Sequence, residues 1–162
     1  MKQTFHESLR FAPFDLAGNR ELFLRCYADT WQLAHGSLDG FEPNATYRAS
    51  LYRASVSPES ILGMRREDEF LGLIAFDERR GKREKLLWIS FLYIVPEHRR
   101  EGLGRCLIER AALRARELNR TELQLCTARG NSALHFYEAL DFRVCGTEPG
   151  ALEPLLKLRL SV

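Results

Sequence analysis

Thirteen residues decide how this sequence is interpreted: 92-LYIVPEHRREGLG-104. The stretch starts inside the run Leu86–Val95, which is apolar on both faces, as is typical of a central strand covered on both sides. Pro96 ends the strand because proline has no N–H to donate to a sheet. Arg99, Arg100 and two glycines follow and lead into a long helical pattern. The segment therefore predicts a buried strand, a short loop and a helix start.

This helix start is also a candidate anion site. The first amides of a helix have no partner within it and carry the positive end of the macrodipole, so phosphate binds well there. Gly102 and Gly104 have no Cβ, so a ligand can approach the backbone, and Arg99 and Arg100 add charge-assisted donors. The same residues also fit a plain strand-to-helix turn with solvated arginines. The segment is neither a P-loop nor a dinucleotide fingerprint, because it lacks G-K-[ST] and has Leu107 in place of the third glycine.

Strand and helix patterns alternate on both sides of this segment. Before it, we expect a short first strand, two helices and a hairpin; after it, a helix, a strand, a short helix and two more strands. The expected ranges outside the central strand are Leu16–Ala34 and Ala45–Ser55 (helices), Ile61–Arg65 and Phe70–Phe76 (strands), Leu103–Leu118 (helix), Leu123–Thr127 (strand), Ser132–Leu140 (helix), and Phe142–Cys145 and Leu155–Leu160 (strands). Such alternation predicts a layered α/β fold, a single domain over residues 1–162 with a mixed central sheet flanked by helices.

Composition excludes several classes of protein. The chain has 162 residues, of which 45% are apolar and 28% charged, which argues against disorder. A net charge of +2 gives no case for general nucleic-acid binding or a polybasic membrane anchor. No apolar run reaches the roughly 20 residues that span a bilayer, and no secretory signal is evident. We therefore expect a cytoplasmic protein without membrane or nucleic-acid partners.

The cysteines and histidines are scattered. Cys26, Cys106, Cys126 and Cys145 form no C-x-x-C pair; they could make two disulfides in a secreted chain, but separate reduced thiols fit a cytoplasmic protein. Cys106 and Cys126 fall on a helix and a strand, where we expect burial and not a nucleophilic role. With no Cys/His cluster, no metal site is expected.

Two motifs together resemble the GNAT superfamily of acyl-CoA-dependent N-acetyltransferases. The family's L-x-V-x-P strand is similar to Leu92–Pro96, and its [QR]-x-x-G-x-[GA] loop to Arg99–Gly104. About thirty residues on, the family has an Asn, a Phe-Tyr-Glu helix and a Gly-Phe turn. Here these are Asn131, Phe136–Glu138 and Asp141-Phe142.

The resemblance implies a GNAT-like fold, acetyl-CoA as co-substrate and direct acetyl transfer to a primary amine. It implies that the backbone of Leu92, Tyr93 and Ile94 pairs with the pantetheine arm. It also implies that Tyr137 lies near the CoA sulfur and acts as general acid. A tyrosine has a pKa of about 10 and a free thiol one of about 8.5, so Tyr137 is neutral and can donate a proton or a hydrogen bond to the leaving sulfur. A core aromatic on an amphipathic helix is the other interpretation of Tyr137. The pyrophosphate would lie on Arg99, Arg100, Glu101, Gly102, Leu103 and Gly104.

The second motif departs from the family twice. Asp141 stands where the family has glycine; the turn needs a positive φ, which Asp tolerates better than most residues. The interval from Asn131 to Tyr137 is six residues, where seven is common. Asn131 is therefore a candidate both for CoA contact and for a helix N-cap.

The acceptor side gives weaker signals. The strand Trp88–Leu92 carries no acid, and the nearby acids Glu84, Glu97 and Glu101 fall in loops. His35, expected in the loop after the first helix, is a candidate base or an ordinary polar residue. An acceptor pocket or simple core packing would explain four aromatic residues: Trp31, Tyr47, Trp88 and Phe91.

Three functions remain open from the sequence. The first is an N-acetyltransferase acting on a small-molecule or peptide amine, with a homodimer possible because dimers are common among similar proteins. The second is a non-catalytic acyl-CoA-binding module, motivated by the missing strand carboxylate. The third is an interaction or nucleic-acid module on the same scaffold, which would predict salt-sensitive binding to RNA or DNA.

Overall fold

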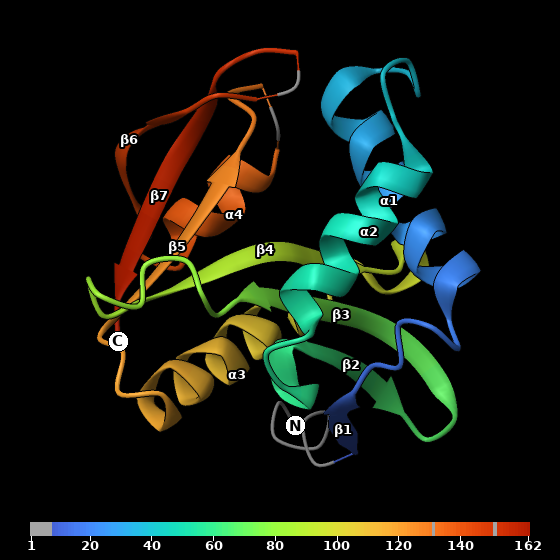
Figure 1. The fold of residues 1–162 in the computed structure, drawn as a ribbon, viewed down its shortest axis with the longest axis horizontal. Helices are drawn as coiled ribbons and strands as arrows, with labels where there is room; N and C mark the ends of the chain where they lie inside the picture. Colours follow the sequence, from blue (N-terminus) through green and yellow to red (C-terminus); the bar gives the residue numbers. More distant parts are fainter. Residues whose placement is uncertain (1–7, 131, 151) are drawn as a thin grey trace.

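A twisted mixed sheet with strand order β1-β2-β3-β4-β5-β7-β6 organises the protein (Figure 1). The computed structural model describes residues 8–130, 132–150 and 152–162. The strands are β1 (Leu9–Pro13), β2 (Ile61–Arg66), β3 (Glu69–Asp77), β4 (Leu86–Ile94), β5 (Glu122–Thr127), β6 (Arg143–Glu148) and β7 (Leu155–Ser161). The helices are α1 (Arg20–His35), α2 (Pro43–Ala54), α3 (Leu103–Glu117) and α4 (Ala133–Ala139), with 3-10 turns at Pro58–Ser60 and Pro96–His98.

The two faces of the sheet bury different clusters. On one face, α3 and α4 cover residues such as Leu71, Leu87 and Leu123, all fully buried. On the other, α1 contributes Phe23 and Cys26 to a cluster with Leu73 and the end of β4. In Figure 1, α1 and α2 lie over the half of the sheet that contains β3, while β5, β6 and β7 lie to the other side. The predicted layered fold is confirmed.

Strand β4 is buried on both faces, as its sequence predicts. Leu87 and Ile89 pack toward α3, whereas Phe91 and Tyr93 pack toward α1. The side-chain alternation changes because β3 pairs Ala75 with Phe91 but Phe76 with Ile89, which leaves Ser90 as an extra, bulged residue. The bulge turns Phe91 and Tyr93 to the α1 face.

The divergence of β4 and β5 positions the site. These parallel strands pair only over Leu86–Trp88 and Glu122–Gln124. After Gln124, β5 no longer follows β4, although β5 stays paired with β7 along its whole length (Figure 1). The last half of β4 therefore has no pairing to β5 along this edge.

The expected elements are all present, and their ends differ in informative ways. The second helix begins at Pro43, two residues before the expected Ala45, because proline is well suited to the first helical turn. The first helix continues to His35 and stops at Gly36, whose φ of 78° is the left-handed conformation that ends helices. The expectation that His35 lies in a loop was therefore wrong.

The four cysteines are free thiols. Burial raises the pKa of Cys26 and of Cys126 to about 11, so both stay protonated at neutral pH. Cys106 is buried in α3, and burial also raises its pKa. The expected burial is therefore confirmed for Cys106, whereas Cys126 is only partly buried.

No helix among residues 8–130, 132–150 and 152–162 combines the length and apolar character that crossing a bilayer requires. No group of three or more His, Cys, Asp or Glu side chains in the same ranges is arranged to hold a metal ion.

Candidate active site

The sequence predicts an anion site at the loop after β4 and the first turn of α3. Gly102, with a φ of 80°, is the N-cap residue of α3. The first helical bond runs from the Cys106 N–H to the Gly102 oxygen at 3.4 Å, so the amides of Leu103, Gly104 and Arg105 have no partner within the helix. Arg100 just before them is exposed and also has a positive φ, 67°. Free amides and an exposed cation at one helix N-terminus suit a phosphate group.

The two glycines of this loop are needed for different reasons. At Gly102 the backbone is left-handed and a Cβ would meet nothing within 4 Å, so conformation alone favours glycine there. At Gly104 a Cβ would lie 2.8 Å from Cζ of Phe136. The small size of Gly104 therefore lets α4 pack against α3, a role that the sequence argument about ligand approach did not include.

A groove of about 680 Å³ runs from the end of β4, where β4 no longer pairs with β5, to the first turn of α3 and to α4. This volume lies within the range of small-molecule sites. Of the residues predicted to bind CoA or act in catalysis, the groove brings together Leu92, Tyr93, Ile94, Arg99, Arg100, Gly102, Leu103, Gly104 and Tyr137. Glu101 lies in the loop outside this lining, and Asn131 is outside the described residues.

Tyr137 lies on α4 in the wall of the groove. Its ring packs against Phe136, with centroids 5.1 Å apart, and edge-on against Phe142 at 5.5 Å. Burial raises the pKa of Tyr137 to about 12. The side chain is therefore a neutral proton donor at physiological pH, as a general acid requires.

The turn after α4 has the conformation predicted for it. Asp141 has a φ of 71°, so Asp occupies the left-handed region where the family has glycine. The Phe142 N–H donates to the backbone carbonyl oxygen of Tyr137 at 3.1 Å, and this bond connects the turn to the helix. This departure from the family pattern therefore leaves the packing of Phe142 on Tyr137 intact.

Arg99 differs from the simple expectation of a phosphate-binding side chain. Its Nε donates to the Ile94 carbonyl at 2.9 Å, and its terminal nitrogen donates to Oδ2 of Asp29 at 2.9 Å. The hydroxyl of Tyr93 donates to the same Asp29 oxygen at 2.8 Å. Burial, followed by this hydrogen bond, raises the pKa of Tyr93 above its usual value. The Arg99 guanidinium thus links α1 to the end of β4 beside the groove.

Asp29 was missed in the sequence. It lies three residues after buried Cys26 and one before Thr30, and residues three or four apart share a helix face. The sequence contained one signal for Asp29, namely a carboxylate beside the apolar face of the predicted helix. Its partners on β4 and the following loop could not be named from the sequence, because they are 64 and 70 residues away.

His98 connects the loop to the β2–β3 turn. Its Nε2 lies 2.6 Å from Oε1 of Glu69, and its Nδ1 lies 3.1 Å from Oε2 of Glu101. Hydrogen bonds to these two carboxylates raise the pKa of His98 above its usual value. Glu101, expected as a solvated loop acid, is therefore engaged with His98, while Glu84 and Glu97 are exposed.

The sequence profile of the GNAT acetyltransferase family matches residues 17–142. The chain belongs to this family. It is accordingly an acetyltransferase, and the loop and groove described above occupy the segment that carries the family motifs. No curated protein sequence is significantly similar to the chain.

Solved acetyltransferase structures share the fold of this acetyltransferase at low sequence identity. Spermidine N-acetyltransferase from Vibrio cholerae, solved with CoA and spermine, is 17% identical, with a TM-score of 0.71 and 96% of each chain covered. PaiA N-acetyltransferase from Thermoplasma acidophilum, solved with coenzyme A, is 16% identical, with a TM-score of 0.67 over 96% of this chain and 99% of that one. The ribosomal-protein-S18-alanine N-acetyltransferase from Escherichia coli is 16% identical, with a TM-score of 0.64 over 94% and 93%.

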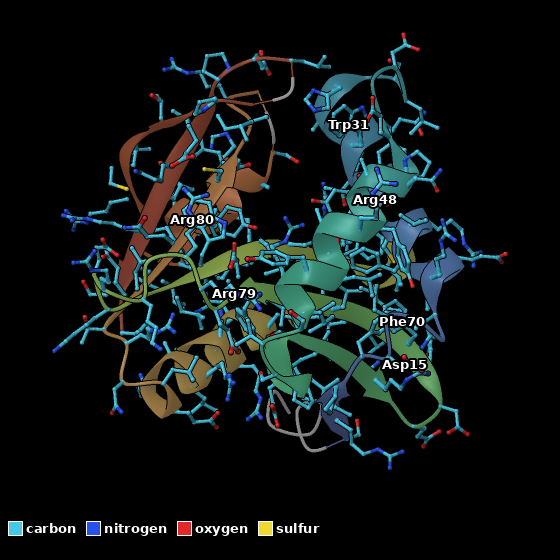
Figure 2. The ribbon with its side chains drawn as sticks, viewed as in Figure 1. Asp15, Trp31, Arg48, Phe70, Arg79 and Arg80 are labelled. Carbon is cyan, nitrogen blue, oxygen red and sulfur yellow. The ribbon has the colours of Figure 1, made fainter. Side chains whose placement is uncertain are left out.

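An aromatic cluster on α1, the loop after it and β4 includes two of the candidates for an acceptor pocket, Trp31 and Phe91. The Trp31 indole donates to the Asp39 carbonyl at 3.1 Å, and its ring lies 4.5 Å from that of His35 (Figure 2 labels Trp31 near the end of α1). Phe41 stacks on Tyr27 at 6.4 Å, and Tyr27 stacks on Phe91 of β4 at 4.5 Å. The cluster links the α1–α2 loop to the central strand.

Trp88 and Tyr47, the other aromatic candidates, are each covered by an arginine. The Arg80 guanidinium lies 3.4 Å from the Trp88 ring centroid and pairs with Glu148 at 2.6 Å; Figure 2 shows Arg80 over the C-terminal strands. Arg20 lies 4.6 Å from the Tyr47 ring centroid. The groove itself is lined on the α1 side by Thr30 and Leu33, and not by the aromatic candidates or His35.

Proposed function

We propose that this acetyltransferase transfers an acetyl group from acetyl-CoA directly to a primary amine. The observation that carries the proposal is the groove that follows the half of β4 that does not pair with β5 to the free amides at the start of α3, with Tyr137 in its wall. An extended arm on the strand and a phosphate at the helix start are the two ligand parts that this shape accommodates. CoA has both.

In this proposal the donor is held mainly by backbone groups. The edge of Leu92, Tyr93 and Ile94 adds an extended chain by strand-type hydrogen bonds. The amides of Gly102–Gly104 bind the pyrophosphate, and exposed Arg100 adds positive charge.

Tyr137 is the general acid of the proposal. Since burial raises its pKa to about 12, it remains protonated and can donate to the sulfur as the thioester bond breaks. The N–C bond forms as the C–S bond breaks. The amine nitrogen gives its proton to solvent water, the thiolate takes one from Tyr137, and Tyr137 regains a proton from solvent. No acyl-cysteine is needed, in keeping with the high pKa of Cys126.

The acceptor in this proposal is a small-molecule or peptide amine that enters from the α1–α2 side. Among the structural neighbours, spermidine and the alanine of a ribosomal protein are acceptors of the respective enzymes. The aromatic cluster around Trp31 lies on α1 and the loop between α1 and α2, and in this proposal it contacts the body of the acceptor.

Thermal unfolding with acetyl-CoA, and with NAD and ATP as controls, tests the donor. A ligand that binds only the folded protein stabilises it by about 2.7 kcal/mol at a hundredfold excess over its dissociation constant. We expect a rise in the midpoint with acetyl-CoA and none with NAD or ATP. If acetyl-CoA produces no shift and neither do longer acyl-CoAs, the proposed donor is wrong.

An amine panel read by release of the CoA thiol tests the transfer. Spermidine, an aminoglycoside and a peptide with N-terminal alanine cover the acceptor classes. Turnover with one class identifies the acceptor. Acetyl-CoA binding without turnover above the background of Tyr137→Phe would support the non-catalytic module, and salt-sensitive RNA or DNA binding without acetyl-CoA binding would support the nucleic-acid module.

A further inference from the structure

A single carboxylate oxygen joins three elements beside the groove. Oδ2 of Asp29, on α1, accepts from the Tyr93 hydroxyl at 2.8 Å and from a terminal nitrogen of Arg99 at 2.9 Å. Tyr93 belongs to β4, and Arg99 begins the loop that leads to α3. Tyr93 is 64 residues and Arg99 is 70 residues after Asp29 in the chain.

Arg99 extends this connection into the backbone of the groove. Its Nε donates to the Ile94 carbonyl at 2.9 Å, and its guanidinium carbon lies 5.4 Å from the Tyr93 ring centroid. The guanidinium is therefore fixed on three sides by Asp29, the end of β4 and an aromatic ring. Ile94 and Arg99 flank the turn at Pro96–His98, which leads to the free amides at the start of α3.

We propose that Asp29 is a positioning residue for the donor site: through Arg99 and Tyr93 it fixes the end of β4 relative to the phosphate-binding loop. Asp29 need not touch the donor in this role. The inference rests on the proposed function, because it concerns how well the same groove is prepared for acetyl-CoA. Preorganisation of a site raises affinity by lowering the ordering cost of binding.

The size of the effect follows from the environment. The side chains of Arg99 and Asp29 are 36% and 35% exposed, so solvent weakens the charge attraction between them. What remains is geometric: two charge-assisted hydrogen bonds and the orientation that they impose. We expect removal of the Asp29 carboxylate to weaken acetyl-CoA binding about tenfold, the factor that corresponds to about 1.4 kcal/mol.

The test is calorimetric titration of acetyl-CoA into the full chain and its variants. The variants are Asp29→Ala, the isosteric Asp29→Asn, Arg99→Ala and the double variant with both alanines. Glu21→Gln, which neutralises an exposed carboxylate in the first turn of the same helix, is the matched control. Thermal midpoints without ligand establish that each variant is folded.

The double variant separates positioning from a general structural effect. If Asp29 acts through Arg99, Asp29→Ala weakens binding about tenfold in the wild-type background but less than twofold in the Arg99→Ala background. Asp29→Asn keeps an oxygen acceptor and should bind with intermediate affinity. Glu21→Gln should bind like the wild type.

Three results would overturn the inference. Acetyl-CoA affinity of Asp29→Ala within twofold of the wild type, or tighter, would mean that Asp29 does not prepare the site. A tenfold loss in both backgrounds would mean that it acts independently of Arg99. An equal loss in Glu21→Gln would assign the effect to net charge. Failure of the wild type to bind acetyl-CoA would instead overturn the proposed function, so the two failures are distinguishable.

Discussion

The proposed donor side and the proposed acceptor side of this acetyltransferase, called the donor side and the acceptor side below, are built in different ways. The donor side comes largely from one continuous stretch, Leu92–Gly104, completed by Tyr137 on α4. The acceptor side is assembled from α1, the loop after it and separate strands, through contacts such as Trp31 to Asp39 and Tyr27 to Phe91. A site on one short segment leaves a motif in the sequence, whereas a site made of distant side chains does not.

The difference extends to the chemical groups used. The donor side offers mainly backbone: a strand edge without a partner and amides at a helix start. The acceptor side offers side chains: rings stacked on one another and an arginine over Trp88. Backbone groups suit a donor shared across a family, while side chains vary freely and can select an acceptor. Four experiments test this contrast.

Tyr137→Phe should have the largest effect, on the donor side. We expect kcat to fall about 100-fold, the lower range for general acid catalysis, because the leaving sulfur loses its proton donor. Acetyl-CoA affinity measured by calorimetry should stay within twofold. Tyr52→Phe, on an exposed tyrosine of α2, is the control and should leave both quantities unchanged. A kcat within threefold of wild type for Tyr137→Phe would remove Tyr137 from the mechanism.

Alanine at the two loop glycines should separate conformation from packing. At Gly104 a Cβ would lie 2.8 Å from Phe136, so we expect overpacking that costs about 1–3 kcal/mol of the free energy of unfolding. At Gly102 the space is open but φ is 80°, so we expect about 1–2 kcal/mol of backbone strain.

A second substitution checks that assignment. Phe136→Leu added to Gly104→Ala should restore part of the stability, because a smaller side chain leaves room for the new methyl group. The same addition to Gly102→Ala should restore nothing. Urea unfolding measures all four free energies, and rescue of both glycine variants, or of neither, would contradict the stated causes.

Trp31→Phe tests the acceptor side and should have a smaller effect. The substitution removes the indole N–H that donates to the Asp39 carbonyl at 3.1 Å, a bond with a net value of about 0.5–1.5 kcal/mol. The KM for the amine identified by the panel should rise about two- to tenfold, while the KM for acetyl-CoA stays constant. A change in the acetyl-CoA KM alone would mean that the two sides are not separate.

His98→Gln should give the smallest effect, visible in how stability depends on pH. The folded pKa of His98 is raised by Glu69 and Glu101, so protonated His98 stabilises the protein fully below the unfolded pKa of about 6.5. This contribution is lost as pH rises through the raised folded pKa. The thermal midpoint of the variant should therefore fall further below wild type at pH 6 than at pH 9. An equal difference at both values would contradict the role of the charge.

The sequence predicted the elements around the central strand well because their signals are local. Pro96 ends β4 and glycine begins α3 within a few residues, as expected. The positive φ of Asp141 was also predicted, since the need for it follows from the immediate turn. The prediction for the C-terminal end of α1 was wrong: His35 is helical because the helix stops only at Gly36.

What the sequence by itself determined is the layered fold, the family and the stretch Leu92–Gly104 with its helix start, since periodicity and short-range motifs fix all three. Only the tertiary structure decided that Gly104 makes room for Phe136, that Arg99 is held by Asp29, and that β4 no longer pairs with β5 beyond Trp88. The reason is physical: each of these depends on which surfaces meet when distant segments pack, and no local pattern encodes that choice.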